Sequence, residues 1–292
     1  MTRSSPLSVP AVDAPAVSDV LSPRAHPAVE IRTLRTIAEC EACVALQREV
    51  WGFEPTDVVP VTLLHVVDYV GGLAAGAFDA SGELLGFVFG VSGVRDGELV
   101  HWSHMLGVRE SARNLGLGRM LKEHQRDALA RLGIRRVFWS FDPLMAKNAY
   151  FNFNRLAASV VEYVPDMYGT TASPLHLGLP TDRLVVTTST SVEEADRHPA
   201  RSGQLPLLSP FPREGDEVLG PEDRLPEAVL VEVPPDILEI TRRSLTTARQ
   251  WRLAVREHFH WALANGYDIE SVRRDAGADR EFYVLARSMT AK

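Results

Sequence analysis

The feature that most constrains this 292-residue chain is an apolar strand followed by a glycine-bearing turn and a long amphipathic helix. Residues 99–108 are apolar and aromatic with two interleaved histidines, a pattern typical of a buried strand. Residues 113–118, RNLGLG, form the turn. Apolar side chains spaced three and four apart then indicate one helix face as far as residue 132.

The turn is suited to binding an anion. The first turn of a helix has N–H groups without intrahelical partners, the helix dipole places partial positive charge there, and glycines let the backbone approach a phosphate. Arg113 and Arg119 flank the turn and add charge. An ordinary tight turn into a surface helix is the alternative. A Walker A loop is excluded because Arg119 follows the second glycine, and a dinucleotide fingerprint is excluded because Leu121 replaces its third glycine.

The pattern Arg113-x-x-Gly116-x-Gly118 after an apolar strand resembles the acyl-CoA-binding motif of the GNAT family of N-acyltransferases, Arg/Gln-x-x-Gly-x-Gly/Ala. The resemblance extends over about residues 31–190, and the tail beyond has no such motif. It implies that acetyl-CoA or another acyl-CoA is a co-substrate and that an amine accepts the acyl group by direct attack, without a covalent enzyme intermediate.

Composition and charge limit the kinds of partner that we expect the protein to bind. The chain is 45% hydrophobic and 24% charged with a net charge of −7, so we expect a globular protein that binds no nucleic acid. No run of eighteen apolar residues is present, which argues against a membrane span. Residues 1–28 are rich in Pro, Ala, Ser and Val and lack the apolar core of a signal peptide, so we expect a flexible tail and a cytoplasmic protein without membrane contacts.

The two cysteines, Cys40 and Cys43, are too few for a disulfide framework. No second Cys or His pair stands at metal-binding spacing. We therefore expect reduced thiols in the core or on a helix surface, and no metal site.

The order of predicted elements favours an α+β fold, because several short consecutive strands lead into a helix. Thr36 and Glu39 form a capping box for a helix that Gly52 ends, and a second helix starts at Pro60. The resemblance implies a GNAT-like mixed, mostly antiparallel sheet flanked by helices. Predicted strands span residues 28–34, 73–78, 84–91, 99–108, 134–141, 159–164 and 184–190, and predicted helices span 36–51, 60–69, 117–132 and 144–156.

The predicted domains are a tail (1–28), the GNAT-like domain (29–192), a linker (193–226) and a C-terminal β-α-β-β unit (227–289). In that unit we expect a strand at 228–233, a single helix at 236–265, and strands at 267–273 and 282–286. The unit can extend the main sheet or form a separate subdomain. Its helix carries aromatics that suit either a core or the interface of a homodimer.

The resemblance assigns the residues that hold CoA. The pantetheine arm pairs with the backbone of the central strand, which must splay from strand 134–140, and the Leu106 backbone donates to the thioester oxygen. Asn148 fits the position of a helix-borne Asn that contacts pantetheine in many relatives, and Asn152 lies one turn further on. The implied cofactor-binding residues are Met105, Leu106, Val108, Arg113, Asn114, Leu115, Gly116, Leu117, Gly118, Arg119, Asn148 and Asn152.

The candidate acid and base come from the strand and from a loop. Many relatives use a helix Tyr as the acid, but Phe153 stands at that position, and Tyr150 or Tyr168 can replace it. We favour Tyr168, on a loop that can fold over the thioester. His101 and His104 are three apart and so face opposite sides of the strand. We favour His104 as the base, and the alternative for each His is a core role.

The predicted function is therefore transfer of an acetyl or other short acyl group, such as succinyl, from CoA to the amine of a small molecule such as an amino acid. If the acyl chain carries a carboxylate, Arg155 or Lys147 can pair with it. The alternative is a CoA-binding or regulatory module without catalysis, because the usual Tyr is missing.

Overall fold

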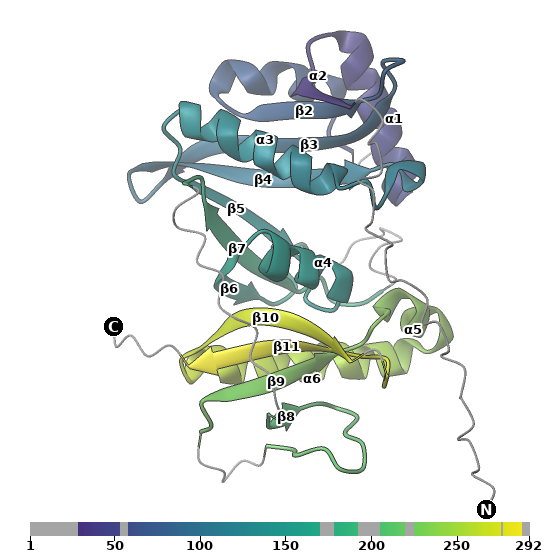
Figure 1. Ribbon diagram of the computed structural model, residues 1–292, viewed down its shortest axis with the longest axis vertical. Coiled ribbons are helices and arrows are strands. Elements are labelled where there is room, and N and C mark those ends of the chain that lie inside the picture. Colours follow the sequence, from purple (N-terminus) through teal and green to yellow (C-terminus); the bar gives the residue numbers. More distant parts are fainter. Residues whose placement is uncertain are drawn as a thin grey trace, which may run out of the picture.

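The computed structural model describes residues 29–52, 58–169, 178–191, 205–219, 225–275 and 277–287, which form two sheets (Figure 1). The larger has the order β1-β2-β3-β4-β5-β7-β6, and the smaller has the order β10-β11-β9-β8. Neighbouring strands run antiparallel, except for the parallel pairs β4/β5 and β8/β9. The predicted α+β class with a mostly antiparallel sheet is confirmed. The predicted tail lies outside the described residues.

The element bounds follow the predicted order. The strands are β1 (Glu30–Thr33), β2 (Leu73–Phe78), β3 (Leu84–Arg95), β4 (Glu98–Val108), β5 (Arg136–Phe141), β6 (Ser159–Val164), β7 (Arg183–Ser189), β8 (Leu207–Leu208), β9 (Ala228–Val233), β10 (Tyr267–Asp275) and β11 (Arg280–Arg287). The helices are α1 (Ile37–Trp51), α2 (Val61–Val66), α3 (Leu117–Arg131), α4 (Ala146–Tyr150), α5 (Ile237–Arg243) and α6 (Leu245–Ala264), with 3₁₀ turns η1 (Val67–Val70) and η2 (Glu110–Ala112) and a π-helical turn η3 (Phe151–Arg155).

Helices cover both faces of the larger sheet, with α3 in front and α1 behind in Figure 1. Successive residues of β3 point to opposite faces of this sheet, and each face has its own hydrophobic cluster. Phe87 and Phe89 pack in the cluster under α1, whereas Val88 packs in the cluster under α3. The predicted capping box of Thr36 and Glu39 is present at the start of α1. Cys43 lies buried on the inner face of that helix, and burial raises the pKa of its thiol to about 12. Cys40 and Cys43 are both free thiols in this core.

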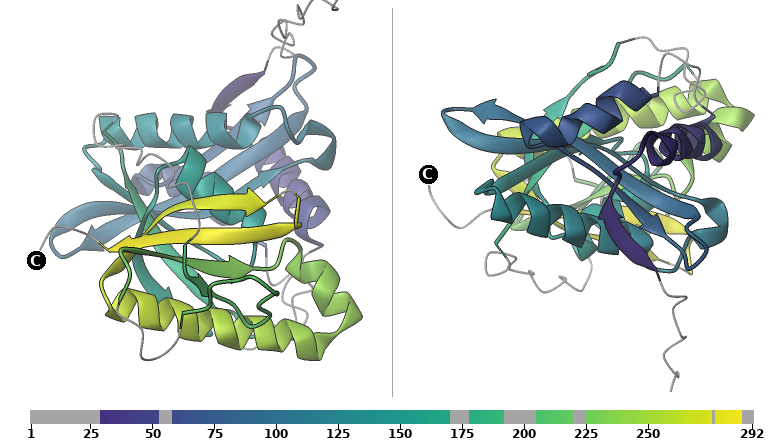
Figure 2. Two further views of the ribbon diagram at one scale, coloured as in Figure 1. Left: turned by 60° about the horizontal axis from the view of Figure 1, so that its bottom comes forward. Right: turned by 90° about the horizontal axis from the view of Figure 1, so that it is seen from above.

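The C-terminal unit differs from the prediction in two ways. The single helix expected over residues 236–265 is two helices, because Ser244 adopts an extended conformation that ends α5, and its Oγ accepts from Thr247 N at 3.2 Å to cap α6. Part of the expected linker, residues 205–219, adds the edge strand β8, because its Leu207 is buried beside Leu230 of β9. Figure 2 shows α6 running along this smaller sheet.

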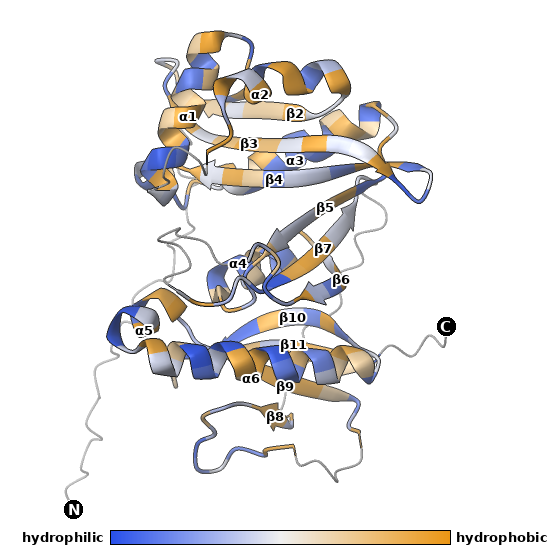
Figure 3. Ribbon diagram, turned by 180° about the vertical axis from the view of Figure 1, so that it is seen from behind, coloured by the Kyte–Doolittle hydropathy of each residue, from blue (hydrophilic) through white to orange (hydrophobic). Residues whose placement is uncertain are grey.

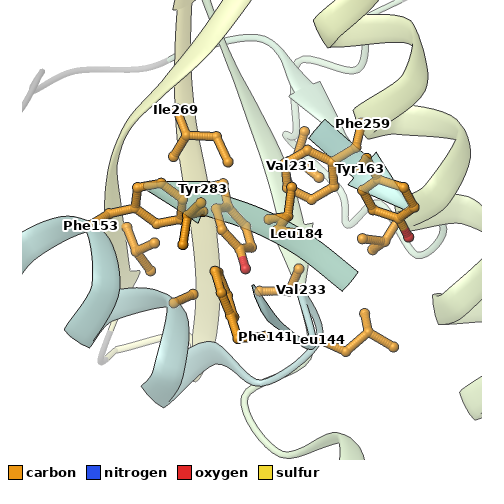
Figure 4. Packing of buried hydrophobic residues seen from close by; sticks show 14 of the residues in the cluster. Phe141, Leu144, Phe153, Tyr163, Leu184, Val231, Val233, Phe259, Ile269 and Tyr283 are labelled. Carbon is orange, nitrogen blue, oxygen red and sulfur yellow. The ribbon is translucent and has the colours of Figure 1, made fainter. Parts of the chain in front are cut away.

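The two sheets share one hydrophobic core. Phe153 of η3 meets Tyr283 of β11 at 6.0 Å between ring centroids, and Tyr163 of β6 stacks on Phe259 of α6 at 5.7 Å (Figure 4). From α6, Trp251, Val255 and Phe259 belong to this core. Figure 3 shows hydrophobic and hydrophilic residues alternating along the helix, the pattern of a helix with one face buried. The unit is therefore packed against the β5-β7-β6 half of the larger sheet.

Buried polar contacts fix the same junction. Arg252 of α6 donates two hydrogen bonds to the Asp142 carboxylate, at 2.9 and 2.5 Å, and Arg256 donates two to Asp182, at 2.8 and 2.6 Å. The Tyr283 hydroxyl donates to the carbonyl of Pro143 at 2.8 Å. Bidentate pairs of this kind fix orientation as well as distance. In the part of the chain that is described, no helix combines the length and apolarity needed to cross a bilayer.

Candidate active site

The central strand parts from its neighbour halfway along its length. Parallel pairing between β4 and β5 covers only Val100–Trp102 with Arg136–Phe138, whereas β4 stays paired with β3 as far as Val108. The remaining halves of β4 and β5 diverge, which leaves a gap between them. This is the splay that the resemblance predicts between these two strands.

A bulge in β4 separates the two histidines. The register with β3 shifts between the Phe89–Met105 and Gly90–Ser103 pairs, which leaves His104 as the extra residue. His101 is buried on the α3 side, where its ring contacts Gln125. His104 is exposed on the other side, edge-on to Phe89 at 6.1 Å between ring centroids. The predicted opposite orientation of the two rings is confirmed.

Backbone groups of β4 face the gap. Arg109 N donates to Leu85 O at 2.8 Å, which fixes the alternation of hydrogen-bonded and non-hydrogen-bonded pairs along β3 and β4. By this alternation the N–H and C=O groups of Leu106 and Val108 point away from β3, into the gap. Those of Met105 point toward β3. Of the three backbone positions predicted to pair with pantetheine, Leu106 and Val108 are the two with suitable orientation.

The glycine-bearing turn presents a row of N–H groups at the mouth of this gap. Gly116 has φ 76° and precedes the first residue of α3, while Asn114 has φ 67°. No hydrogen bond within the described residues uses the N–H groups of residues 114–118. The Arg113 and Arg119 side chains are half exposed, and each pairs with a glutamate of its own segment, Glu110 at 3.8 Å and Glu123 at 2.7 Å. The turn thus has the donors and charge that an anion requires.

A buried hydrogen-bond chain starts at the base of the gap. Lys122 of α3 donates from Nζ to Ser103 Oγ at 2.7 Å and lies 4.6 Å from the ring centroid of Trp139 on β5. Among the described residues no carboxylate is within ion-pair distance of it. Burial lowers the pKa of this ammonium to about 7. Lys122 therefore titrates near neutrality at the point where the two strands separate.

The chain continues through Gln125 and His101 to Ser92 of β3. Lys122 Nζ is 3.4 Å from Gln125 Oε1, and Gln125 Nε2 is 3.1 Å from His101 Nε2. On the other side of the ring, His101 Nδ1 is 3.0 Å from Ser92 Oγ. The Ser92 hydroxyl donates to the carbonyl of Gly71. Because the Ser92 hydroxyl is a donor to that carbonyl, His101 carries its proton on Nδ1. Burial and the nearby Lys122 lower the pKa of His101 to about 4, so the ring is neutral at pH 7.

His104 is placed differently. Its imidazole is open to solvent on one side and surrounded by protein on the other, and this desolvation lowers its pKa below the usual 6.5. The ring is neutral at pH 7 and has a lone pair available. Of the two histidines, only His104 meets solvent, so it is the one that can accept a proton from a substrate.

A cavity of about 230 Å³ lies at the end of β5. Ser140 Oγ on its wall is 3.0 Å from the hydroxyl of Tyr168, and the Arg183 guanidinium lies 5.2 Å from the centroid of the Tyr168 ring. Asn148 lines this cavity. Its lining residues are Trp51, Ser140, Phe141, Asp142, Met145, Asn148, Leu179, Arg183, Ile237, Leu238, Thr241 and Arg252.

Asn152 does not share the surroundings of Asn148. It is buried, and its Oδ1 accepts from Trp139 Nε1 at 3.1 Å, so it orients the indole that faces Lys122. The two amides therefore have different partners: Asn148 lines the cavity at the end of β5, whereas Asn152 is held by Trp139.

A second cavity, of about 290 Å³, lies on the α3 face between α3, β5 and η3. Lys122, Trp139 and Arg155 line it, so Arg155 is placed near the base of the gap. Lys147 is exposed and lines neither cavity. Among the described residues, no group of three or more His, Cys, Asp or Glu side chains is placed to hold a metal ion.

Sequence reasoning missed Lys122 and the contribution of the C-terminal unit. A signal for Lys122 exists, since it and Gln125 are polar residues next to the apolar positions Leu121 and Leu129 of an otherwise amphipathic helix. No local signal reports that Arg252, 110 residues later in the chain, reaches Asp142.

No family model matches the chain, and no curated protein matches it. Solved structures do resemble it. The ribosomal-protein-S18-alanine N-acetyltransferase of Escherichia coli is 17% identical over 56% of this chain and 96% of its own, with a TM-score of 0.44. A GNAT-family acetyltransferase of Streptococcus pneumoniae is 12% identical over 56% and 99%, with a TM-score of 0.45. Naa50 of Arabidopsis thaliana, in complex with a CoA-containing bisubstrate analogue, is 14% identical over 55% and 98%, with a TM-score of 0.43.

Proposed function

We propose that the protein is an acyl-CoA-dependent N-acyltransferase that transfers an acetyl or other short acyl group to the amine of a small molecule. The observation that carries this proposal is the gap between β4 and β5, into which Leu106 and Val108 direct their peptide groups beside the free N–H row of residues 114–118. A thioester with a phosphate-bearing arm matches both parts, since the row suits pyrophosphate and the strand edge suits an extended amide arm.

In this mechanism the neutral amine attacks the thioester carbonyl carbon, and the carbonyl electrons move to oxygen. The Leu106 N–H donates to that oxyanion. His104 takes the proton that the amine must lose, directly or through a water. Collapse of the intermediate breaks the C–S bond, and the CoA thiolate leaves with a proton from Tyr168, whose hydroxyl is held beside Ser140. No enzyme-bound acyl intermediate forms.

The class of acyl group and the size of the acceptor are proposed from the two cavities. The cationic cavity that holds Lys122 and Arg155 supports an acyl chain ending in a carboxylate, such as succinyl, as well as acetyl. The acceptor is an amine of amino-acid size, because the 230 Å³ cavity beside Ser140 has room for little more. We propose that the reaction is cytoplasmic.

A thiol-release assay with acetyl-CoA and succinyl-CoA against a panel of amines tests the proposal, with calorimetry of CoA binding as a parallel measurement. We expect CoA binding and amine-dependent thiol release. CoA binding without release from any pair would support the alternative, a CoA-binding module without catalysis. Failure of both measurements would exclude an acyl-CoA site altogether.

A further inference from the structure

The cavity at the end of β5 lies between the larger sheet with its helices and the helices of the C-terminal unit. One side comes from the larger sheet and its helices, with Trp51 of α1 and Phe141 of β5. The opposite side is α5 and α6 of the C-terminal unit, with Ile237, Leu238 and Thr241 among the lining residues. The larger sheet and its own helices therefore leave this cavity without its outer wall.

Trp51 connects this cavity to the gap between the strands. Its indole packs on Phe87 at 5.8 Å between ring centroids. It also approaches Gly107 so closely that a Cβ there would lie 2.9 Å from its Cη2 atom. Gly107 lies between Leu106 and Val108, whose peptide groups face the gap. An amine bound beside Trp51 is thus next to the carbonyl position assigned to the thioester.

Hydrogen bonds between the two sides hold the outer wall in place. Asp142 lines the cavity but accepts two hydrogen bonds from Arg252 and one, at 2.8 Å, from Leu144 N. Thr241 also lines the cavity, and its hydroxyl donates back to Ile237 O at 2.7 Å. These two polar groups are satisfied within the protein, whereas Ser140, Asn148 and Arg183 lie on the side of the larger sheet. The part of the lining formed by Phe141, Met145 and Leu238 is apolar. A charged group bound against that part would lose water without gaining a partner.

We propose that the C-terminal unit completes the acceptor pocket and that Leu238 of α5 selects an amine with an apolar substituent. This inference rests on the proposed function. Leu238 is the suitable probe because it is partly exposed at the cavity, whereas Ile237 is 3% exposed and belongs to the shared core. The substituent contacts Leu238, Phe141 and Met145, and the amino group faces Trp51 and the gap.

The test compares Leu238→Ala and Leu238→Trp with Leu253→Ala, a matched control because Leu253 is half exposed on α6 and lines neither cavity. Phenethylamine, butylamine and ethanolamine serve as acceptors. We expect Leu238→Trp to raise KM for phenethylamine at least tenfold, with KM for acyl-CoA within twofold of wild type. Leu238→Ala should shift preference toward larger amines, and Leu253→Ala should behave as wild type.

Calorimetry of phenethylamine binding in the presence of CoA makes the outcome independent of turnover. Weaker binding of phenethylamine to Leu238→Trp, with unchanged CoA affinity, supports the placement of the amine against Leu238. This holds even if no amine is acylated, and in that case only the proposed function fails. Equal binding to wild type and Leu238→Trp, no binding of phenethylamine to wild type, or preference for ethanolamine overturns the inference. Thermal unfolding of each variant confirms that it is folded.

Discussion

The ammonium of Lys122 lies 2.7 Å from the hydroxyl of Ser103 on β4. Met105, two residues later on the same strand, has its side chain on the other face of the sheet. This contact places a lysine from α3 where β4 and β5 separate, against Trp139. The other atoms of the chain, through Gln125 and His101, are neutral hydrogen-bonding groups. The position places an ammonium group where it is desolvated and has no carboxylate partner in the described part of the chain, and this has consequences for stability.

Replacement of Lys122 should change how stability depends on pH. Burial sets the pKa of Lys122 to about 7 in the folded state, against an ordinary 10.5, so between these values the unfolded chain binds more protons. The contribution of Lys122 to the free energy of unfolding therefore rises with pH in that range, by at most about 1.4 kcal/mol per pH unit. Lys122→Met should remove this slope, measured by urea unfolding from pH 7 to 10. An identical slope in both proteins would place the titrating group elsewhere.

His104 should be needed for turnover and not for CoA binding. We expect His104→Gln to lower kcat/KM by about 10²–10⁴-fold, the usual contribution of a general base. Because desolvation lowers the pKa of His104, the acidic limb of the wild-type rate profile should lie below pH 6.5 and should be absent from the variant. CoA affinity by calorimetry is the control. A variant that loses affinity and rate in parallel would show that the ring is structural.

The two glycines of the turn should respond differently to alanine. Gly116 has φ 76°, so Gly116→Ala should cost about 1–2 kcal/mol of folding stability. A Cβ at Gly118 would lie 3.8 Å from Leu106 and Phe151, an ordinary contact, so Gly118→Ala should fold normally. We expect Gly118→Ala to weaken CoA binding at unchanged thermal stability, because the added methyl group lies beside the N–H row assigned to the phosphates. Unchanged affinity would move the pyrophosphate away from this turn.

The pair of Arg252 and Asp142 should dominate the attachment of the C-terminal unit. The Arg252 side chain is 1% exposed, so Asp142→Asn leaves a buried charge without its partner and should cost about 3–5 kcal/mol. The exposed pair of Arg243 and Glu239 has a similar distance, 2.7 Å, and Glu239→Gln should cost less than about 1 kcal/mol. Urea unfolding compares the two. Equal losses would mean that burial does not set the strength of these pairs.

Much of the fold was predictable because it depends on local chemistry. The capping box of Thr36 and Glu39, the turn at Gly116 and the order of strands each follow from neighbouring residues. The break at Ser244 was missed because a serine fits both a helix interior and an N-cap, and tertiary packing decides between them. The core shared by the two sheets was missed because the apolar residues of α6 and those of β5, β6 and β7 show that each surface is buried, and they do not show that the two surfaces pack against each other.

The site was predictable to a similar depth. Opposite faces for His101 and His104 follow from strand alternation, although the bulge at His104 could not be located from sequence. The contact of Lys122 with Ser103 depends on how α3 lies on the sheet, which spacing alone does not give. The outer wall from α5 depends on Arg252 finding Asp142, a contact between distant parts of the chain.

The position of β11 in the smaller sheet has a consequence for folding in the cell. β9 pairs with β11, although α5, α6 and β10 lie between them in the chain, so β9 must wait for all three before its inner edge is covered. The larger sheet is complete in sequence before β9 is synthesised, and domains tend to fold in that order on the ribosome. During this interval the nascent chain lacks the wall that α5 gives to the cavity at the end of β5. Until β11 is made, the inner edge of β9 also has unpaired N–H and C=O groups, which leaves this edge of the nascent chain open to pairing with another strand.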